Sequence, residues 1–346
     1  MSKVLEEIRT PWAFVTDLLF GETNTNPTET IAIDSIIGGR KMAPFVTPGA
    51  GAALLQGMKA QRSLVTAPNI RAKRPFSSRQ LLFNRSPGSP IFVDGGHILS
   101  EVQRKIARDL KYGKEQIDQT LEWMCCQALT GVLTYNIATA NGQPGDAFTI
   151  DYGRPPENTI VLTSTDTWDT PKATATKSID DLVVQVKEMV SDKVGVPITD
   201  CILGKDASDA FRRNEQMRED QDNRRIVSGE LNLVKQFEAS GALFLGELYG
   251  VRWWRYSRDV EDPFGTTINL IEADKAHFVS RSPGADNIIE YGAIDDLDAA
   301  LDGPISTKFF SKSWREKDPS TLMYLWQSRP LPVPRRPESM VTVTVV

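Results

Sequence analysis

The side chains most often used in catalysis and metal binding are few and scattered in this sequence. His97 and His277 are the two histidines, and neither has another histidine or a cysteine at a metal-ligand spacing. Cys125 and Cys126 are adjacent, so on a helix their side chains point about 100° apart and cannot act as a C-x-x-C pair. Cys201 lies in an apolar run. We therefore predict structural roles for both histidines and buried packing positions for the thiols.

The glycine-rich and acidic runs lack the residues that would complete a binding site. Pro48–Leu54 begins like a dinucleotide fingerprint, but its third glycine position is a leucine and no acidic residue follows at the ribose distance. Gly204–Lys205 lacks the upstream glycine of a phosphate loop. The acidic run at 295–298, with Asp302, lacks the glycine and the glutamate of a calcium loop, so it indicates a solvated acidic surface.

The adjacent tryptophans Trp253 and Trp254 resemble a base-stacking patch. Neighbouring residues of a strand face opposite sides, so we predict that one is in the core and that the other forms a lid or an interface. The sequence contains neither a G-x-S-x-G nucleophile elbow nor an H-E-x-x-H zinc motif. It therefore predicts no catalytic residue, no cofactor and no metal, and an enzyme with an unrecognised site is the least favoured alternative.

The distribution of charge allows binding between copies of the chain. From Gly38 to Val93 there is no acidic residue, although the net charge is −5, so the remainder of the chain carries −14 (−5 minus 9). The nine cations of this basic segment, which we predict as inter-subunit contacts, are Arg40, Lys41, Lys59, Arg62, Arg71, Lys73, Arg74, Arg79 and Arg85. Heterologous docking of a cationic segment on the anionic body of another copy builds rings and shells. Charge alone favours a solvated basic loop, and the rest of the chain favours binding between copies.

The composition is that of a globular protein with two or three core-bearing units, at 346 residues with 40% hydrophobic and 25% charged residues. No apolar run is long enough to span a bilayer. Glu6, Glu7 and Asp17 surround the apolar residues at 12–15, a pattern unlike a signal peptide. The odd number of cysteines does not suggest a disulfide framework, so we expect synthesis in a reducing interior. The negative charge argues against DNA binding by broad phosphate neutralisation.

The clearest predicted element is a long helix over Ile98–Val132. Its apolar residues recur every three or four positions and define one face, which extends for roughly eight turns at the helical period. We expect this face to line the core and the helix to cross the whole subunit. The residues of the face are Val102, Ile106, Leu110, Ile117, Leu121, Met124 and Ala128.

Shorter elements are predicted on both sides of this helix. A short helix lies within Leu5–Phe20, and the basic segment should form a two-stranded excursion that needs support from another surface. Ser178 is the predicted N-cap of a helix with Asp181 in its first turn, and it opens a compact α/β unit over 178–303. Strands are predicted at 31–36, 133–137, 148–152, 197–204, 242–256, 276–280, 321–326 and 340–345.

Four short motifs and the order of the elements carry a resemblance to a known family. Each motif is similar to a segment of one family. The motifs are Met42–Pro48 followed by small residues, Leu129–Tyr135 at the end of the long helix, Phe148–Arg154, and Gln327–Pro334 near the end of the chain. The chain resembles the major capsid proteins of tailed phages with the Hong Kong 97 fold, and more narrowly the phage lambda coat protein family. The similarity covers nearly the whole chain and is weakest through 205–300.

The resemblance implies an α+β capsid fold with four parts. These are an N-terminal arm at 1–37, an extended β-hairpin loop at 38–93, a peripheral domain at 94–177 and 304–346 with the long helix as its spine, and an axial α/β domain at 178–303. It also implies a shell of hexamers and pentamers that encloses double-stranded DNA, with a scaffold, a portal and in some relatives a decoration protein as partners. A cellular encapsulin, which shares this fold, is the related alternative.

Overall fold

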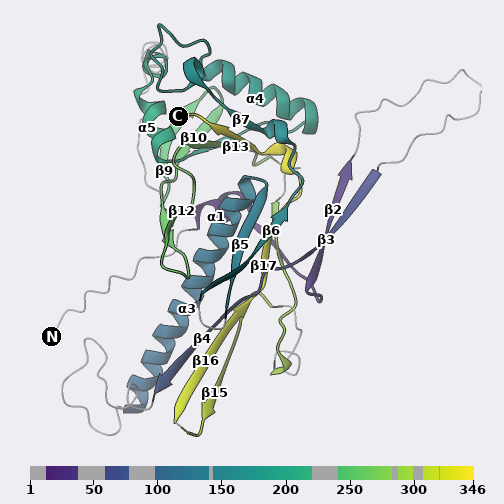
Figure 1. Cartoon of the computed structure of the whole chain (residues 1–346), viewed down its shortest axis with the longest axis vertical. Helices are drawn as coiled ribbons and strands as arrows, with labels where there is room; N and C mark the ends of the chain where they lie inside the picture. The colour runs from purple at the N-terminus through teal and green to yellow at the C-terminus, as the bar shows by residue number, and fades with distance from the viewer. Residues whose placement is uncertain are drawn as a thin grey trace, which may run out of the picture.

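The chain folds into a mixed α/β structure built around one long helix and one six-stranded sheet (Figure 1). The computed structural model describes residues 13–37, 59–77, 98–139, 143–219, 241–282, 287–298, 307–318 and 320–346. His97, Asp302, the Pro48–Leu54 run and residues 1–12 lie outside these ranges. Within them, no helix has the length and apolar character needed to cross a membrane.

The six-stranded sheet has a helical layer on each face. Its strands, in spatial order, are β7 (Thr159–Val161), β18 (Val341–Thr344), β13 (Lys275–Val279), β8 (Asp200–Leu203), β10 (Val251–Arg255) and β9 (Leu243–Leu248). One apolar cluster joins the sheet to α4 (Ile179–Val194) and α5 (Lys205–Arg213). A second cluster joins the other face to α1 (Phe14–Leu19) and the end of the long helix.

The long helix, α3 (Ile98–Leu129), runs from this sheet toward the opposite end of the subunit (Figure 1). Ile117, Leu121, Met124 and Ala128 are buried, which confirms that part of the predicted apolar face. Leu110 is half-buried, and the side chains of the face before it lie outside the described residues. The predicted helix end at residue 132 is slightly late, because Thr130 and Gly131 form a turn and Gly131 has a φ of 82°.

The far end of α3 supports a three-stranded antiparallel sheet. This lower sheet consists of β15 (Phe310–Glu316), β16 (Thr321–Ser328) and β4 (Ile70–Ser77). Between the two sheets lie β1 (Glu22–Thr25), β14 (Asn287–Tyr291) and β17 (Pro330–Pro334), which form a further three-stranded sheet. The described residues also form the short pair β11 (Asp259–Glu261) and β12 (Thr267–Asn269) and 3-10 turns at 156–158, 164–166 and 337–339.

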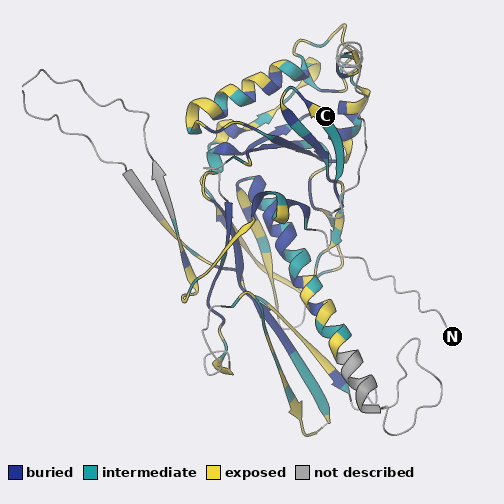
Figure 2. Cartoon of the chain, turned by 180° about the vertical axis from the view of Figure 1, so that it is seen from behind, coloured by how far each residue is buried: buried dark blue, intermediate teal, exposed yellow. Residues whose placement is uncertain are grey.

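Two hairpins extend from the middle of the subunit. β2 (Thr30–Ile37) pairs with β3 (Lys59–Thr66) over eight residues each, and Figure 1 shows this ribbon pointing away from the body. β5 (Val132–Ala138) pairs with β6 (Pro144–Asp151) beside α3. Figure 2 shows the same ribbon on the other side of the picture, with the buried residues gathered around α3 and the six-stranded sheet.

The strand pairing crosses the predicted domain boundaries in several places. β7 and β18, both predicted in the peripheral domain, join the sheet of the 178–303 unit, whereas β14 leaves that unit to pair with β1 and β17. The basic segment does not form one two-stranded excursion, because β3 pairs with β2 and β4 pairs with β16. These pairings join residues far apart in sequence, where no local pattern specifies the partner. The division into four parts otherwise stays a prediction.

Both tryptophans of the Trp253–Trp254 pair are buried, so the prediction of a lid or interface is wrong. Their side chains do face opposite sides of β10, as strand geometry requires. Trp253 packs in the cluster with α4 and α5, and Trp254 packs against Phe14 of α1 with ring centroids 5.2 Å apart. The prediction failed because helices cover both faces of the six-stranded sheet, so neither side of β10 faces solvent.

The predicted structural roles of the described histidine and the cysteines are confirmed by burial. His277 lies inside the six-stranded sheet with Nδ1 3.1 Å from Oγ1 of Thr342. Cys125, Cys126 and Cys201 are free and buried, and burial raises the pKa of each thiol. Such thiols are poor nucleophiles.

Candidate functional site: a surface for contacts between subunits

The structure distributes the nine predicted contact cations over three regions. Arg71, Lys73 and Arg74 lie on β4 at the edge of the lower sheet. Lys59 and Arg62 belong to β3 in the projecting ribbon, where the backbone alone is described. The other four, Arg40, Lys41, Arg79 and Arg85, lie outside the described residues.

Two of the β4 cations have carboxylate partners in their own subunit. Arg71 lies 3.5 Å from Oδ2 of Asp296, and Arg74 lies 3.3 Å from Oδ1 of Asp109 on α3. Arg74 therefore points toward the long helix, whereas Arg71 lies on the opposite face of β4. Lys73 shares the face of Arg71 and is exposed, and no carboxylate of the described residues lies within ion-pair distance of it.

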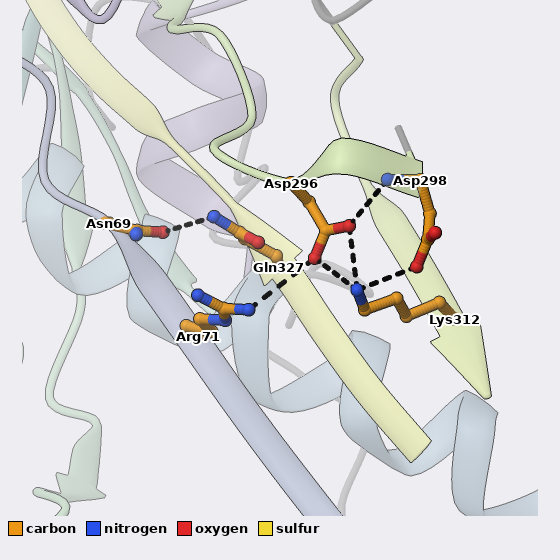
Figure 3. A network of polar contacts seen from close by, with 6 residues as sticks. All are labelled: Asn69, Arg71, Asp296, Asp298, Lys312 and Gln327. Carbon is orange, nitrogen blue, oxygen red and sulfur yellow. Dashed lines mark hydrogen bonds and ion pairs between the residues drawn. The ribbon is translucent and has the colours of Figure 1, made fainter. Parts of the chain in front are cut away.

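Asp296 organises a charged network on the outer face of the lower sheet (Figure 3). Its side chain is 3% exposed and accepts a hydrogen bond from Lys312 of β15 at 2.7 Å. Lys312 also donates to Asp298 at 2.8 Å. Burial alone would raise the pKa of Asp296, but the Lys312 hydrogen bond, the backbone N–H of Asp298 and the Arg71 charge outweigh it and hold that pKa below its usual value. The prediction of a solvated acidic surface is thus wrong for Asp296.

The base of the projecting ribbon is fixed to the body by backbone hydrogen bonds and one ion pair. The N–H of Ala293 donates to the carbonyl of Thr28 at 3.0 Å. The N–H of Ala67 donates to the carbonyl of Glu29 at 3.2 Å. The buried Arg329 lies 3.0 Å from a carboxylate oxygen of Glu29 and donates to the Ala293 carbonyl at 3.1 Å. These polar contacts therefore set the direction in which the ribbon leaves the subunit.

The described residues hold no arrangement suited to catalysis or metal binding. No three His, Cys, Asp or Glu side chains among them are grouped as a metal site would require. A polar hollow of about 300 Å³ on α5 is lined by Asp209, Arg212, Arg213 and Arg218. Asp209 is already paired with Arg255 at 3.0 Å, and the hollow brings no nucleophile together with a base.

Sequence patterns identified the basic segment but missed the acidic partners on the same chain. Asp109 occupies a surface position of a long helix, and Asp296 sits in an acidic run that reads as a solvated turn. Both become partners only because β4 pairs with β16 and thereby lies beside α3 and residues 295–298.

Comparison with known proteins gives one consistent family. A sequence model described as phage major capsid protein E matches residues 1–345. The major capsid protein of Enterobacteria phage P21 is 24% identical over 344 residues, which span 96% of this chain and 94% of that protein. The alignment therefore spans nearly the full length of the P21 protein.

Solved structures share the fold at lower identity. The crystal structure of a prophage capsid protein from Escherichia coli CFT073 superposes with a TM-score of 0.68 at 18% identity, covering 97% of this chain and 93% of that one. The mature capsid protein of bacteriophage PhiM1 superposes with a TM-score of 0.53 at 10% identity, covering 99% of this chain and 90% of that one. The holo-SrpI encapsulin of Synechococcus elongatus superposes with a TM-score of 0.50 at 10% identity, covering 100% of this chain and 92% of that one. At these identities the likeness concerns the fold alone.

Proposed function

This chain belongs to the phage major capsid protein E family and is a major capsid protein of a phage head, and from that premise we propose how it assembles. Its copies associate into hexamers and pentamers of an icosahedral shell that encloses double-stranded DNA. The ribbon of β2 and β3 lies over a neighbouring subunit and brings the basic segment to that neighbour's carboxylates. The family is structural, and we propose no catalytic activity.

The observation that carries this proposal is the projection of the β2–β3 ribbon beyond the body, together with its charge (Figure 1). A two-stranded hairpin is marginally stable alone in water and gains support from a second surface. The basic segment carries nine cations and no acid, while the rest of the chain is anionic. Arg71 and Arg74 are paired within the subunit, so we assign the exposed Lys73 and the ribbon positions Lys59 and Arg62 to the neighbour, although Asp34 of β2 stands opposite Arg62 in the ladder.

The proposed partners follow from the role in a head. A scaffold, a portal and in some relatives a decoration protein would contact the shell, and assembly would take place in the host cytoplasm. DNA would be enclosed without sequence-specific binding, because a net charge of −5 does not favour broad phosphate contacts. Binding of DNA by opened empty shells at physiological salt should be weak, and tight binding that survives high salt would contradict this.

An encapsulin-type shell is the second candidate, supported by the fold alone. The sequence relatives favour the phage head, since the P21 match spans nearly the whole of both chains. Particles purified with a packaged enzyme and no capacity for DNA would favour the encapsulin.

A charge-reversal pair tests the proposed contact. Lys59→Glu with Arg62→Glu should strongly reduce the yield of shells, measured by sedimentation and electron microscopy, while the urea midpoint of the free subunit stays unchanged. Each exposed ion pair contributes only ~0–1 kcal/mol, but a shell repeats the contact in every subunit. The matched control is Lys205→Glu with Arg213→Glu on exposed positions of α5, which changes the net charge equally. Normal shells from the first pair, or equal loss from both, would contradict the proposal.

A further inference from the structure

The outer face of α5 takes part in a polar hollow that is lined by three arginines. Asp209, Arg212 and Arg213 are spaced three and four residues apart, so they share one face of this helix. The buried Phe211 lies on the opposite face, which packs against the six-stranded sheet. Arg218 completes the lining of the hollow, whose volume is about 300 Å³. The apolar packing of α5 therefore holds its charged residues on the outside.

The turn that follows α5 brings Arg218 to the same hollow. Asn214 forms this turn, because its N–H donates to the Ala210 carbonyl at 2.9 Å and its side-chain oxygen accepts from the N–H of Met217 at 3.3 Å. Met217 is buried in the same apolar cluster as α5. The next residue, Arg218, donates from Nε to the Arg212 carbonyl at 3.3 Å. The position of Arg218 is thus fixed by packing on one side and by a hydrogen bond on the other.

The hollow carries an excess of positive charge. Asp209, the carboxylate that lines it, already pairs with Arg255 of β10 at 3.0 Å. With Arg255 included, the group has a net charge of +3 (four arginines minus one aspartate). In the described part of the chain, no carboxylate forms an ion pair with Arg212, Arg213 or Arg218. Such a concentration of one charge in a concave surface attracts ions of the opposite charge.

The electrostatics of α5 itself explain only part of this arrangement. Cations in the last turn of a helix interact favourably with its negative end, which accounts for Arg212 and Arg213. Arg218 lies beyond the end of α5, so this effect does not require it. The Ala210 and Arg212 carbonyls at that end already accept hydrogen bonds. These bonds partly satisfy the negative end of α5, which therefore opposes an anion in the hollow less strongly.

We propose that this hollow binds the phosphate groups of a polyanion. A guanidinium presents its N–H donors in a planar fork that matches two oxygens of one phosphate. A phosphate group carries up to about two negative charges and three strong acceptor oxygens, so two such groups can balance the cluster where one carboxylate cannot. The volume lies at the lower end of the range for small-ligand pockets, which fits a short polyphosphate. The backbone of enclosed DNA offers the same groups.

One subunit supplies every residue of the hollow, so the proposal does not rest on the shell and can be tested on the free full-length chain. Isothermal titration with sodium tripolyphosphate should show saturable binding to the wild type. Arg212→Gln with Arg213→Gln should weaken this binding about tenfold or more, the change expected for losing a single hydrogen bond to a charged group. Arg218→Gln should also weaken it, and because Arg218 lies outside α5 this variant separates a lost ligand contact from a weakened helix end.

The matched control is Arg335→Gln with Arg336→Gln, which removes an adjacent exposed pair of arginines outside the hollow. This variant should bind tripolyphosphate as the wild type does, and the urea midpoint of each variant checks that it is folded. Absence of tripolyphosphate binding by the wild type, or equal weakening in the control, would overturn the proposal. Equal weakening would show that the probe responds to net charge and not to the hollow.

Competition distinguishes the two sources of phosphate. A short DNA duplex that displaces tripolyphosphate from the wild type would assign the site to the DNA backbone, and a duplex that leaves it bound would assign the site to a small free polyphosphate. The assembly control, Lys205→Glu with Arg213→Glu, should form shells and yet bind tripolyphosphate more weakly. Failure of the wild-type chain to form shells would contradict the proposed function and not the phosphate site.

Discussion

Gly113 of the long helix packs so closely on the indole ring of Trp326 that a Cβ added at Gly113 would lie 2.6 Å from Cε2 of that ring. Real Cβ contacts are not this short, so the position requires glycine. Gly113 is the residue through which α3 approaches β16, the central strand of the lower sheet. Glycine lowers the local stability of the helix, but its lack of a side chain lets α3 lie close to the sheet that carries the β4 cations.

Gly113→Ala should destabilise the subunit although alanine is the better helix former. Alanine in a helix interior is favoured over glycine by about 1 kcal/mol, whereas overpacking a core contact costs typically ~1–3 kcal/mol. We expect a lower urea midpoint and changed tryptophan fluorescence. Gly21→Ala is the control, since no atom lies within 4 Å of its added Cβ. An unchanged or raised midpoint for Gly113→Ala would show that the ring moves aside without cost.

The carboxylate of Glu122 ties α1 to the long helix. It is fully buried and accepts hydrogen bonds from the N–H of Val15 at 2.7 Å, from the N–H and hydroxyl of Thr16 at 2.9 and 2.7 Å, and from the hydroxyl of Tyr256 at 3.0 Å. Burial raises its pKa, against the opposing effect of these hydrogen bonds.

Glu122→Ala should detach α1 from the helix that holds it. Each buried donor left without an acceptor costs about 1–3 kcal/mol. Hydrogen exchange at the amides of Val15 and Thr16 should become much faster, and the free energy of unfolding should fall. Gln116→Ala, at an exposed position of the same helix, should change neither. Exchange at Val15 that stays as slow as in the wild type would refute the role of Glu122.

His277 should make the subunit sensitive to acid. Burial, assisted by the positive charges of Arg154 and Lys275, lowers the pKa of His277 to about 3. The unfolded chain, with an ordinary histidine pKa near 6.5, therefore binds the proton more readily than the folded chain. The free energy of unfolding should fall as the pH drops from about 6.5 toward 3, by up to ~1.4 kcal/mol for each pH unit.

His277→Gln separates this effect from that of the carboxylates, which titrate in both proteins. Its free energy of unfolding, measured by urea titration at neutral pH and again near pH 4.5, should decline less on acidification than that of the wild type. An equal decline in both proteins would show that His277 does not carry the acid sensitivity.

Elements with strong local signals could be predicted from the sequence. The apolar period of 117–128 identified the buried face of α3, and Ser178 with Asp181 identified the start of α4. There the structure holds a reciprocal capping box in which the N–H of Asp181 donates to the Ser178 hydroxyl at 3.0 Å. Both signals lie within a few residues, so the local sequence contains all that is needed.

Pairing between distant segments could not be predicted in the same way. β4 pairs with β16 across about 250 residues of sequence, from Ser77 with Thr321 to Ile70 with Ser328. The partners of Arg71 and Arg74, and the burial of Asp296, depend on that pairing. The exposure of Ile137 and Phe148 on the β5–β6 hairpin could not be predicted either, because both are ordinary strand residues in the sequence and only the structure shows where the core ends.

Electron microscopy of the purified, assembled wild-type chain tests the central claim most directly. We predict closed icosahedral shells in which the subunits cluster in sixes and fives, with the β2–β3 ribbon of each subunit lying over a neighbour. A chain that remains a monomer or small oligomer under conditions that favour assembly, or shells in which the ribbon contacts only its own subunit, would contradict the account.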